Sequence, residues 1–92
     1  LLETFTSNLV KPKSLKASPI NMECELFKII DLPIIKENEY NGIIIGKVLG
    51  INIDNEYIKD GRIDVLKLKP LARLGYMDYS KVEDFFEMNR PK

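Results

Sequence analysis

A long stretch of alternating apolar and polar residues constrains this chain more than any other feature. Within residues 20–32, one parity is mainly apolar and the other mainly polar, which is the period-two pattern of a half-buried β-strand. A second run is apolar on both parities near its start, which indicates a strand covered on two faces. The loop Pro33–Gly42 between them ends in Asn-Gly, a strong turn signal. The pattern predicts one long β-hairpin over Ser18–Asp54, with arms Ile20–Leu32 and Ile43–Asp54.

Two irregularities modify this hairpin. Lys28 breaks the apolar parity of the first arm, and Phe27 and Ile29 break the polar one. Gly46 and Gly50 share one face of the second arm, where they mark either bulges or the close approach of a flat ligand or another backbone. At about 3.3 Å per residue the first arm would reach roughly 43 Å, longer than a typical strand, so we expect it to bend or coil as barrel strands do.

Length and charge limit the classes of function. A chain of 92 residues makes one domain or part of one, and its own core would be marginal. It starts Leu1-Leu2-Glu3 without an initiating Met, so we expect a piece of a larger domain, or a domain completed by a partner chain. Fourteen basic and fourteen acidic residues give no net charge, which argues against a nucleic-acid surface. No apolar run reaches the roughly 18 residues of a membrane span and no signal-peptide pattern opens the chain, so we expect a soluble protein. The single cysteine indicates a reducing compartment, and we expect the cytoplasm.

The residue types also limit the chemistry. Histidine is absent, which removes Ser-His and Cys-His nucleophiles and the common zinc sites, so we predict no catalytic side chain and no metal site. Any chemistry would come from a cofactor. The single cysteine, Cys24, shares the parity of Met22 and Leu26 and lies between Glu23 and Glu25, which predicts an inert, buried thiol.

After the hairpin, local signals replace the alternation. Asp60-Gly61 predicts a turn, and Asp64 is a suitable N-cap for a short helix over Val65–Lys69 that Pro70 would end. The chain then divides into an extended leading segment (1–17), the hairpin (18–54), a connection with the short helix (55–80) and a final strand (81–88).

Several short sequence motifs follow one another along the chain: Ser18-Pro19, Glu23-Cys24, Ile45-Gly46-Lys47-Val48, Asp60-Gly61-Arg62-Ile63-Asp64, Leu68-Lys69-Pro70-Leu71-Ala72-Arg73-Leu74-Gly75, Asp78-Tyr79 and Phe86-Glu87-Met88-Asn89-Arg90-Pro91. In this order the chain resembles the C-terminal half of a flavin reductase-like protein. The resemblance implies a mainly β fold, part of an FMN-binding split β-barrel, and a homodimer with flavin near the subunit interface. It also implies that the main phosphate- and ribityl-binding residues precede this sequence. The residues agree, because no Gly-rich loop or Ser/Thr/Lys cluster follows Ser18.

The segment Arg73–Tyr79 is the expected place of a flavin contact. Gly75 would let a planar ring approach the backbone, Tyr76 or Tyr79 would stack on it, and Arg73 would place positive charge near a reduced flavin or a nicotinamide phosphate. Tyr79 as a core aromatic, Arg73 in an interface ion pair and Gly75 as a cap or turn are the structural alternatives. The family usually has a second glycine where this chain has Tyr76.

Two functions follow from the resemblance. The first is an FMN-binding oxidoreductase of the flavin reductase class, passing electrons from NAD(P)H to flavin, ferric iron or a protein acceptor, with this chain as its C-terminal part and enzymatic only when completed by the other half. The alternative is a non-catalytic dimerisation module from a truncated or split gene, without its own flavin site. A small barrel that binds another flat ligand or a protein partner is a third reading. In each, exposed apolar strands predict a homodimer or a partner chain.

Overall fold

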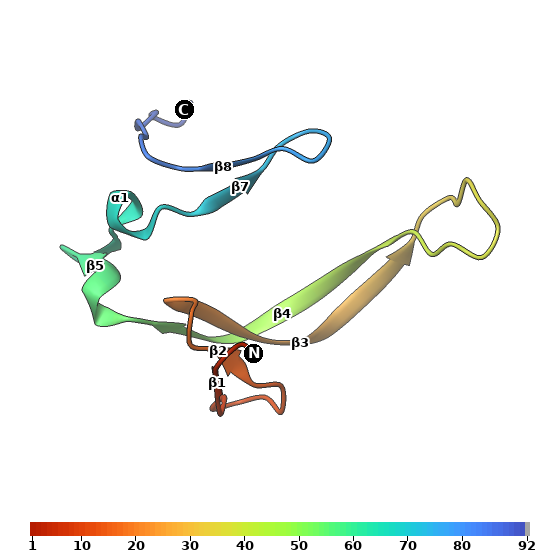
Figure 1. The fold of residues 1–92 in the computed structure, drawn as a ribbon, viewed down its shortest axis with the longest axis horizontal. Coiled ribbons are helices and arrows are strands. Elements are labelled where there is room, and N and C mark those ends of the chain that lie inside the picture. Colours follow the sequence, from red (N-terminus) through yellow and green to blue (C-terminus); the bar gives the residue numbers. More distant parts are fainter. Residues whose placement is uncertain (92) are drawn as a thin grey trace. The chain divides into compact units, whose positions relative to one another are not determined.

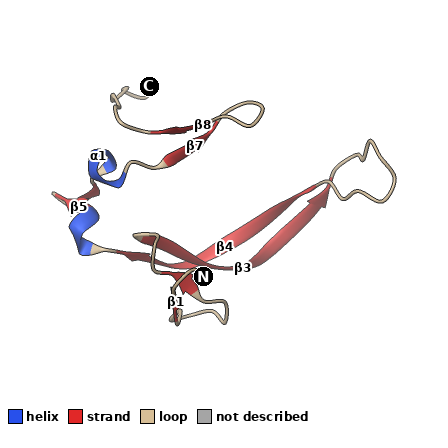
Figure 2. Cartoon of the chain, in the orientation of Figure 1, coloured by secondary structure: helices blue, strands red, loops and turns tan. Residues whose placement is uncertain are grey.

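The computed structural model describes residues 1–91, which form mainly β-strands with little helix (Figures 1 and 2). The elements are β1 (Thr4–Phe5), β2 (Ser14–Leu15), β3 (Ile20–Asp31), β4 (Gly42–Ile53), the 3-10 turn η1 (Asn55–Tyr57), β5 (Ile58–Lys59), β6 (Arg62–Ile63), α1 (Val65–Leu68), β7 (Leu71–Arg73) and β8 (Tyr79–Lys81). Consecutive strands pair into separate two-stranded antiparallel sheets. Two compact units make up the chain, Leu1–Ile53 and the residues from Asp54 onward. The mainly β class, with a long hairpin and a short helix, is confirmed.

The long hairpin forms as the alternation predicts. Strands β3 and β4 pair from Ile20 opposite Ile53 to Asp31 opposite Gly42. One further backbone bond, from Leu32 N to the carbonyl of Asn41 at 2.8 Å, closes the ladder next to the loop. The predicted arms therefore agree with the observed strands to within one residue at each end.

Two bulges interrupt this ladder and explain the broken alternation. One register shift follows the pairing of Leu26 with Gly46 and leaves Phe27 without an opposite residue. Because directly paired residues share a face of the sheet, the shift moves Lys28 to the polar face and Ile29 to the face of Leu26. The break in the alternation at Phe27, Lys28 and Ile29 therefore keeps the face of Leu26 apolar at this point.

The two glycines of β4 lie at these register shifts. Gly50 pairs with Glu23 at the other shift, after which Cys24 pairs with Val48. The interpretation as bulges is confirmed. The atom nearest to a Cβ built on Gly50 is the side-chain Cδ1 of Leu9 in the leading segment, at 2.9 Å, which is neither a flat ligand nor another backbone.

One face of the β3–β4 hairpin is apolar from Ile20 to Ile29 of β3 and becomes polar at Asp31. By register it carries Ile20, Met22, Cys24, Leu26, Ile29, Ile44, Val48, Ile51 and Ile53. No hydrophobic side chain within residues 1–91 is buried, and Ile44 is 69 % exposed. The expectations that β4 is covered on two faces and that Cys24 is buried are therefore wrong for this chain, in which Cys24 is exposed. The reason is that β3 and β4 form a two-stranded sheet without a second layer.

The leading segment, residues 1–17, forms a short pair of strands. Strands β1 and β2 pair antiparallel, with Thr4 opposite Leu15 and Phe5 opposite Ser14. The side chain of Asn21 joins this pair to the hairpin: its Oδ1 accepts from Leu15 N at 3.3 Å and its Nδ2 donates to Leu15 O at 3.2 Å. Residues 1–17 thus fold back on the open end of the hairpin.

Caps and turns organise the second unit, as its sequence predicts. The turn between β5 and β6 has positive φ at Asp60 (53°) and Gly61 (74°), the backbone signature of a type I′ hairpin. The Oδ1 of Asp64 accepts from Lys67 N at 3.3 Å and caps α1. Helix α1 ends one residue before the predicted limit because Lys69 adopts φ 49° ahead of Pro70.

The final strand expected over 81–88 does not form. Strand β8 ends at Lys81, and residues 82–91 have no regular secondary structure. Its neighbour β7 is three residues long and begins at Leu71, and the bond from Val82 N to Pro70 O (2.9 Å) is the last along this edge. Beyond it the tail has no strand to pair with. The helices of the described residues include none with the length and hydropathy needed to cross a membrane.

Candidate functional site

The β7–β8 hairpin brings together the four residues proposed for a flavin contact. Arg73 and Tyr79 are directly opposite in its register, and Gly75 and Tyr76 lie in the loop that joins the strands (Figure 1). Backbone bonds from Leu74 N to Asp78 O (2.9 Å) and from Asp78 N to Gly75 O (3.0 Å) close that loop. Positions separated by up to six residues therefore share one small surface.

Arg73 lies over the ring of Tyr79. The central guanidinium carbon is 4.8 Å from the ring centroid, within the range of a cation–π interaction. Tyr79 is 57 % exposed, so it is not a core aromatic within this chain. None of the ion pairs within residues 1–91 involves Arg73. The pair presents a positive charge and an aromatic face at the surface.

Tyr76 occupies an unusual backbone conformation. Its φ is 58°, in the left-handed region that costs a residue with a Cβ about 1 kcal/mol or more. A glycine would adopt this φ without that cost. The Tyr76 side chain is 94 % exposed.

Gly75, in contrast, has a backbone that any residue could adopt. Among the glycines of the described part, the positive φ belongs to Gly61. A Cβ added at Gly75 would meet nothing within 4 Å. The open backbone at Gly75 is therefore available for contact with another molecule, and its carbonyl takes part in the turn described above.

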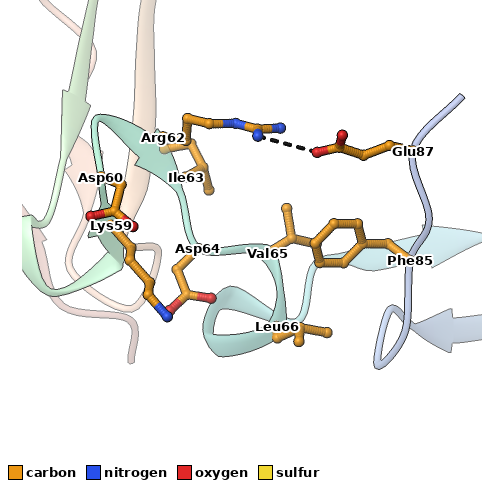
Figure 3. A pocket seen from close by; sticks show the side chains of 9 residues that line it. All are labelled: Lys59, Asp60, Arg62, Ile63, Asp64, Val65, Leu66, Phe85 and Glu87. Carbon is orange, nitrogen blue, oxygen red and sulfur yellow. Dashed lines mark hydrogen bonds and ion pairs between the residues drawn. The ribbon is translucent and has the colours of Figure 1, made fainter. Parts of the chain in front are cut away.

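A separate pocket of about 300 Å³ lies in the same unit (Figure 3). Its lining residues are Lys59, Asp60, Arg62, Ile63, Asp64, Val65, Leu66, Phe85 and Glu87. Arg62 Nη1 donates to Glu87 Oε1 at 3.2 Å, and the ring of Phe85 points toward Val65. The pocket mixes both charges without a cluster of His, Cys, Asp or Glu suited to a metal in the described residues. The sequence held no signal for it, since the tail was expected to be a strand.

Glu23 is the buried charge that sequence reasoning missed. It is 3 % exposed, its Oε1 accepts from Leu9 N at 2.6 Å and its Oε2 accepts from Asn52 Nδ2 at 2.6 Å. These bonds, the Leu9 amide first, hold the pKa of Glu23 below its ordinary value, although burial opposes them. The carboxylate stays ionised at neutral pH and joins the leading segment to β3 and β4. Its role is structural, because its hydrogen bonds hold these segments together. The alternation of β3 could not reveal partners so far away along the chain.

Comparison with known proteins places the fold. The mainly β arrangement of this chain recurs in a monooxygenase component, although no family model matches the sequence. That protein is nitrilotriacetate monooxygenase component B from Bacillus cereus, whose crystal structure matches with a TM-score of 0.81 and 29 % identity over 95 % of this chain and 43 % of its own. An uncharacterised protein of Halalkalibacterium halodurans is 29 % identical over 90 residues, which is 98 % of this chain and 43 % of the relative. The chain spans less than half the length of both.

Proposed function

We propose that this chain is the C-terminal portion of a flavin reductase-like split-barrel protein, a cytoplasmic oxidoreductase that binds FMN. The full protein would move electrons from NAD(P)H to flavin, ferric iron or a protein acceptor. The observation that carries the proposal is the match to a monooxygenase component over 95 % of the chain with a TM-score of 0.81. The order of the short motifs from Ser18 to Pro91 supports the same class.

The β7–β8 hairpin fits the ring system of a flavin. Arg73 offers positive charge, Tyr76 and Tyr79 offer exposed aromatic faces, and Gly75 offers open backbone. Bound FMN would accept a hydride and release electrons one or two at a time, which no side chain of this chain can do. The part of these residues is to bind and orient the ring and to supply a favourable field for negative charge.

The phosphate of FMN requires residues from elsewhere. Within 1–91 the glycines are dispersed and no Gly-rich loop opens a helix of useful length. The apolar face of β3–β4 also lacks a covering layer in this chain. Both observations support a partner chain, either a second subunit of a homodimer or a chain that carries the remaining half.

The same two observations favour the alternative of a non-catalytic dimerisation module. Such a chain would use the apolar face of β3–β4 for association and would bind no flavin. The two functions differ in one measurable property, which is saturable flavin binding by the assembled protein.

An FMN titration of the whole chain tests the proposal. Flavin absorbance and fluorescence are followed while the mass in solution is measured, and NADH oxidation is assayed on any complex that forms. We expect saturable binding that Arg73→Gln weakens roughly five-fold, because a cation–π and charge contribution near 1 kcal/mol is lost. Arg90→Gln, an exposed arginine of the tail, is the matched control. A stable dimer that ignores FMN would support the dimerisation module.

A further inference from the structure

The backbone of Tyr76 adopts a strained, left-handed conformation. Within residues 1–91, the residues other than glycine with positive φ are Asn38, Asp60, Lys69 and Tyr76. Asn and Asp tolerate this region, and Lys69 ends helix α1 there, which is a common use of it. Tyr76 is the bulky residue of the four, a genuine outlier in this region, and its ring extends into solvent.

The loop around Tyr76 holds the ring in place. The two backbone bonds described above close the loop on both sides, so the phenol projects from a defined turn. Next to it lies the open backbone of Gly75, and the Arg73–Tyr79 pair begins and ends the same hairpin loop. A strained residue in a well-bonded loop points to a function, since the surrounding structure maintains the strain.

We propose that Tyr76 is the affinity-determining residue of the flavin site, stacking its ring on the isoalloxazine. This inference rests on the proposed function and deepens it, because it names the residue of this chain that determines the affinity for the flavin ring. The flat three-ring system of a flavin offers a large face for offset stacking on a phenol.

The charge of the hairpin favours a flavin over an apolar protein surface. Residues 71–81 carry two cations, Arg73 and Lys81, against one anion, Asp78, which leaves one net positive charge. FMN carries a phosphate, and its reduced ring is an anion. A contact that combines aromatic faces with a positive charge therefore matches a flavin in both shape and sign.

Tyr76 would contact the ring and not the phosphate. Riboflavin and FMN share the ring and differ in the phosphate, so a change at Tyr76 should alter the affinity for both by the same factor. Tyr76→Gly should raise both dissociation constants roughly tenfold, since stacking is lost. Tyr76→Phe keeps the stacking ring and should bind both flavins like the unaltered chain.

The experiment titrates the whole chain and its variants with riboflavin and FMN, and records thermal unfolding of each. Met77→Ala, at a neighbour that is 88 % exposed, is the matched control and should leave both affinities unchanged. Glycine relieves the strain at position 76, so Tyr76→Gly should unfold no earlier than the unaltered chain, which separates lost binding from lost folding.

The outcomes are distinguishable. Equal flavin affinity of the unaltered chain and Tyr76→Gly would overturn the inference and leave the proposed function standing. A loss confined to FMN would also overturn it, because the contact would then be with the phosphate. If Tyr76→Gly changed only the self-association of the chain, Tyr76 would belong to a protein interface. Absence of flavin binding by the unaltered chain would overturn the inference, because Tyr76 would then not determine the affinity, and the proposed function would still be tested on the chain assembled with its partner.

Discussion

The two units of the chain are both built from antiparallel strand pairs, but different interactions hold them. In residues 1–53, a pair of 12-residue strands runs through two bulges and leaves a face that is apolar from Ile20 to Ile29 of β3. From Asp54 onward the strands are two or three residues long, and capping carboxylates and turns set the backbone. The first unit therefore depends on contacts that are distant in sequence, whereas the second depends on neighbours within a few residues.

The difference between the two units should be largest when a polar residue replaces an apolar one on the apolar face of β3–β4. We expect Ile44→Asn to weaken association by roughly 3–5 kcal/mol, because the partner would then cover an amide without hydrogen-bond partners in place of an isoleucine side chain. Lys28→Asn, on the opposite face of the hairpin, is the matched control and should have little effect. Sedimentation equilibrium over a range of concentrations measures the change. Unaltered association of Ile44→Asn would mean that no partner covers this face.

Acid should loosen the first unit through Glu23. Its folded-state pKa is lowered, so the stability it contributes is present above the ordinary glutamate pKa of about 4.3 and is lost as the pH falls through the folded value. In Glu23→Gln this part of the pH dependence should disappear, with about one proton fewer taken up on acid unfolding. Urea unfolding between pH 3 and 7 measures it, with Glu25→Gln as the control. The same acid dependence in both variants would contradict the structural role of the ionised Glu23.

The smallest effect is expected at the cap of α1. Asp64→Ala should cost about 1 kcal/mol, because Lys67 N loses its acceptor. The damage should stay local, so amide hydrogen exchange should accelerate at 65–69 and not in β3–β4. Glu83→Ala, in the tail, is the control. Faster exchange throughout the long hairpin would show that the two units are not independently ordered.

Sequence patterns predicted the parts of the fold that short-range rules govern. The alternation located both arms of the hairpin to within one residue. The Asp60-Gly61 turn and the Asp64 cap were also predicted, because their hydrogen bonds or backbone angles involve residues at most a few positions apart. The candidate site was partly predictable: the segment was found, and the register that pairs Arg73 with Tyr79 was not.

The tail shows where such rules stop. Its mixed parity suggested a strand over 81–88, but a strand also needs a neighbour with free backbone groups. The last backbone partner along this edge is Pro70, just before β7 begins, so residues 82–91 stay irregular. The tendency to form a strand depends on the residues of the segment itself, whereas strand pairing depends on which other segments lie beside it.

By itself the sequence determined the hairpin, the turn at Asp60-Gly61 and the capped helix, since each is encoded in neighbouring residues. Only the tertiary structure decided that Glu23 is a buried carboxylate with hydrogen-bond partners 14 and 29 residues away. It also decided that Tyr76 carries the strained φ. The physical reason is range: alternation and capping act over a few residues, but the burial of a charge and the closure of a loop depend on which distant backbone groups meet.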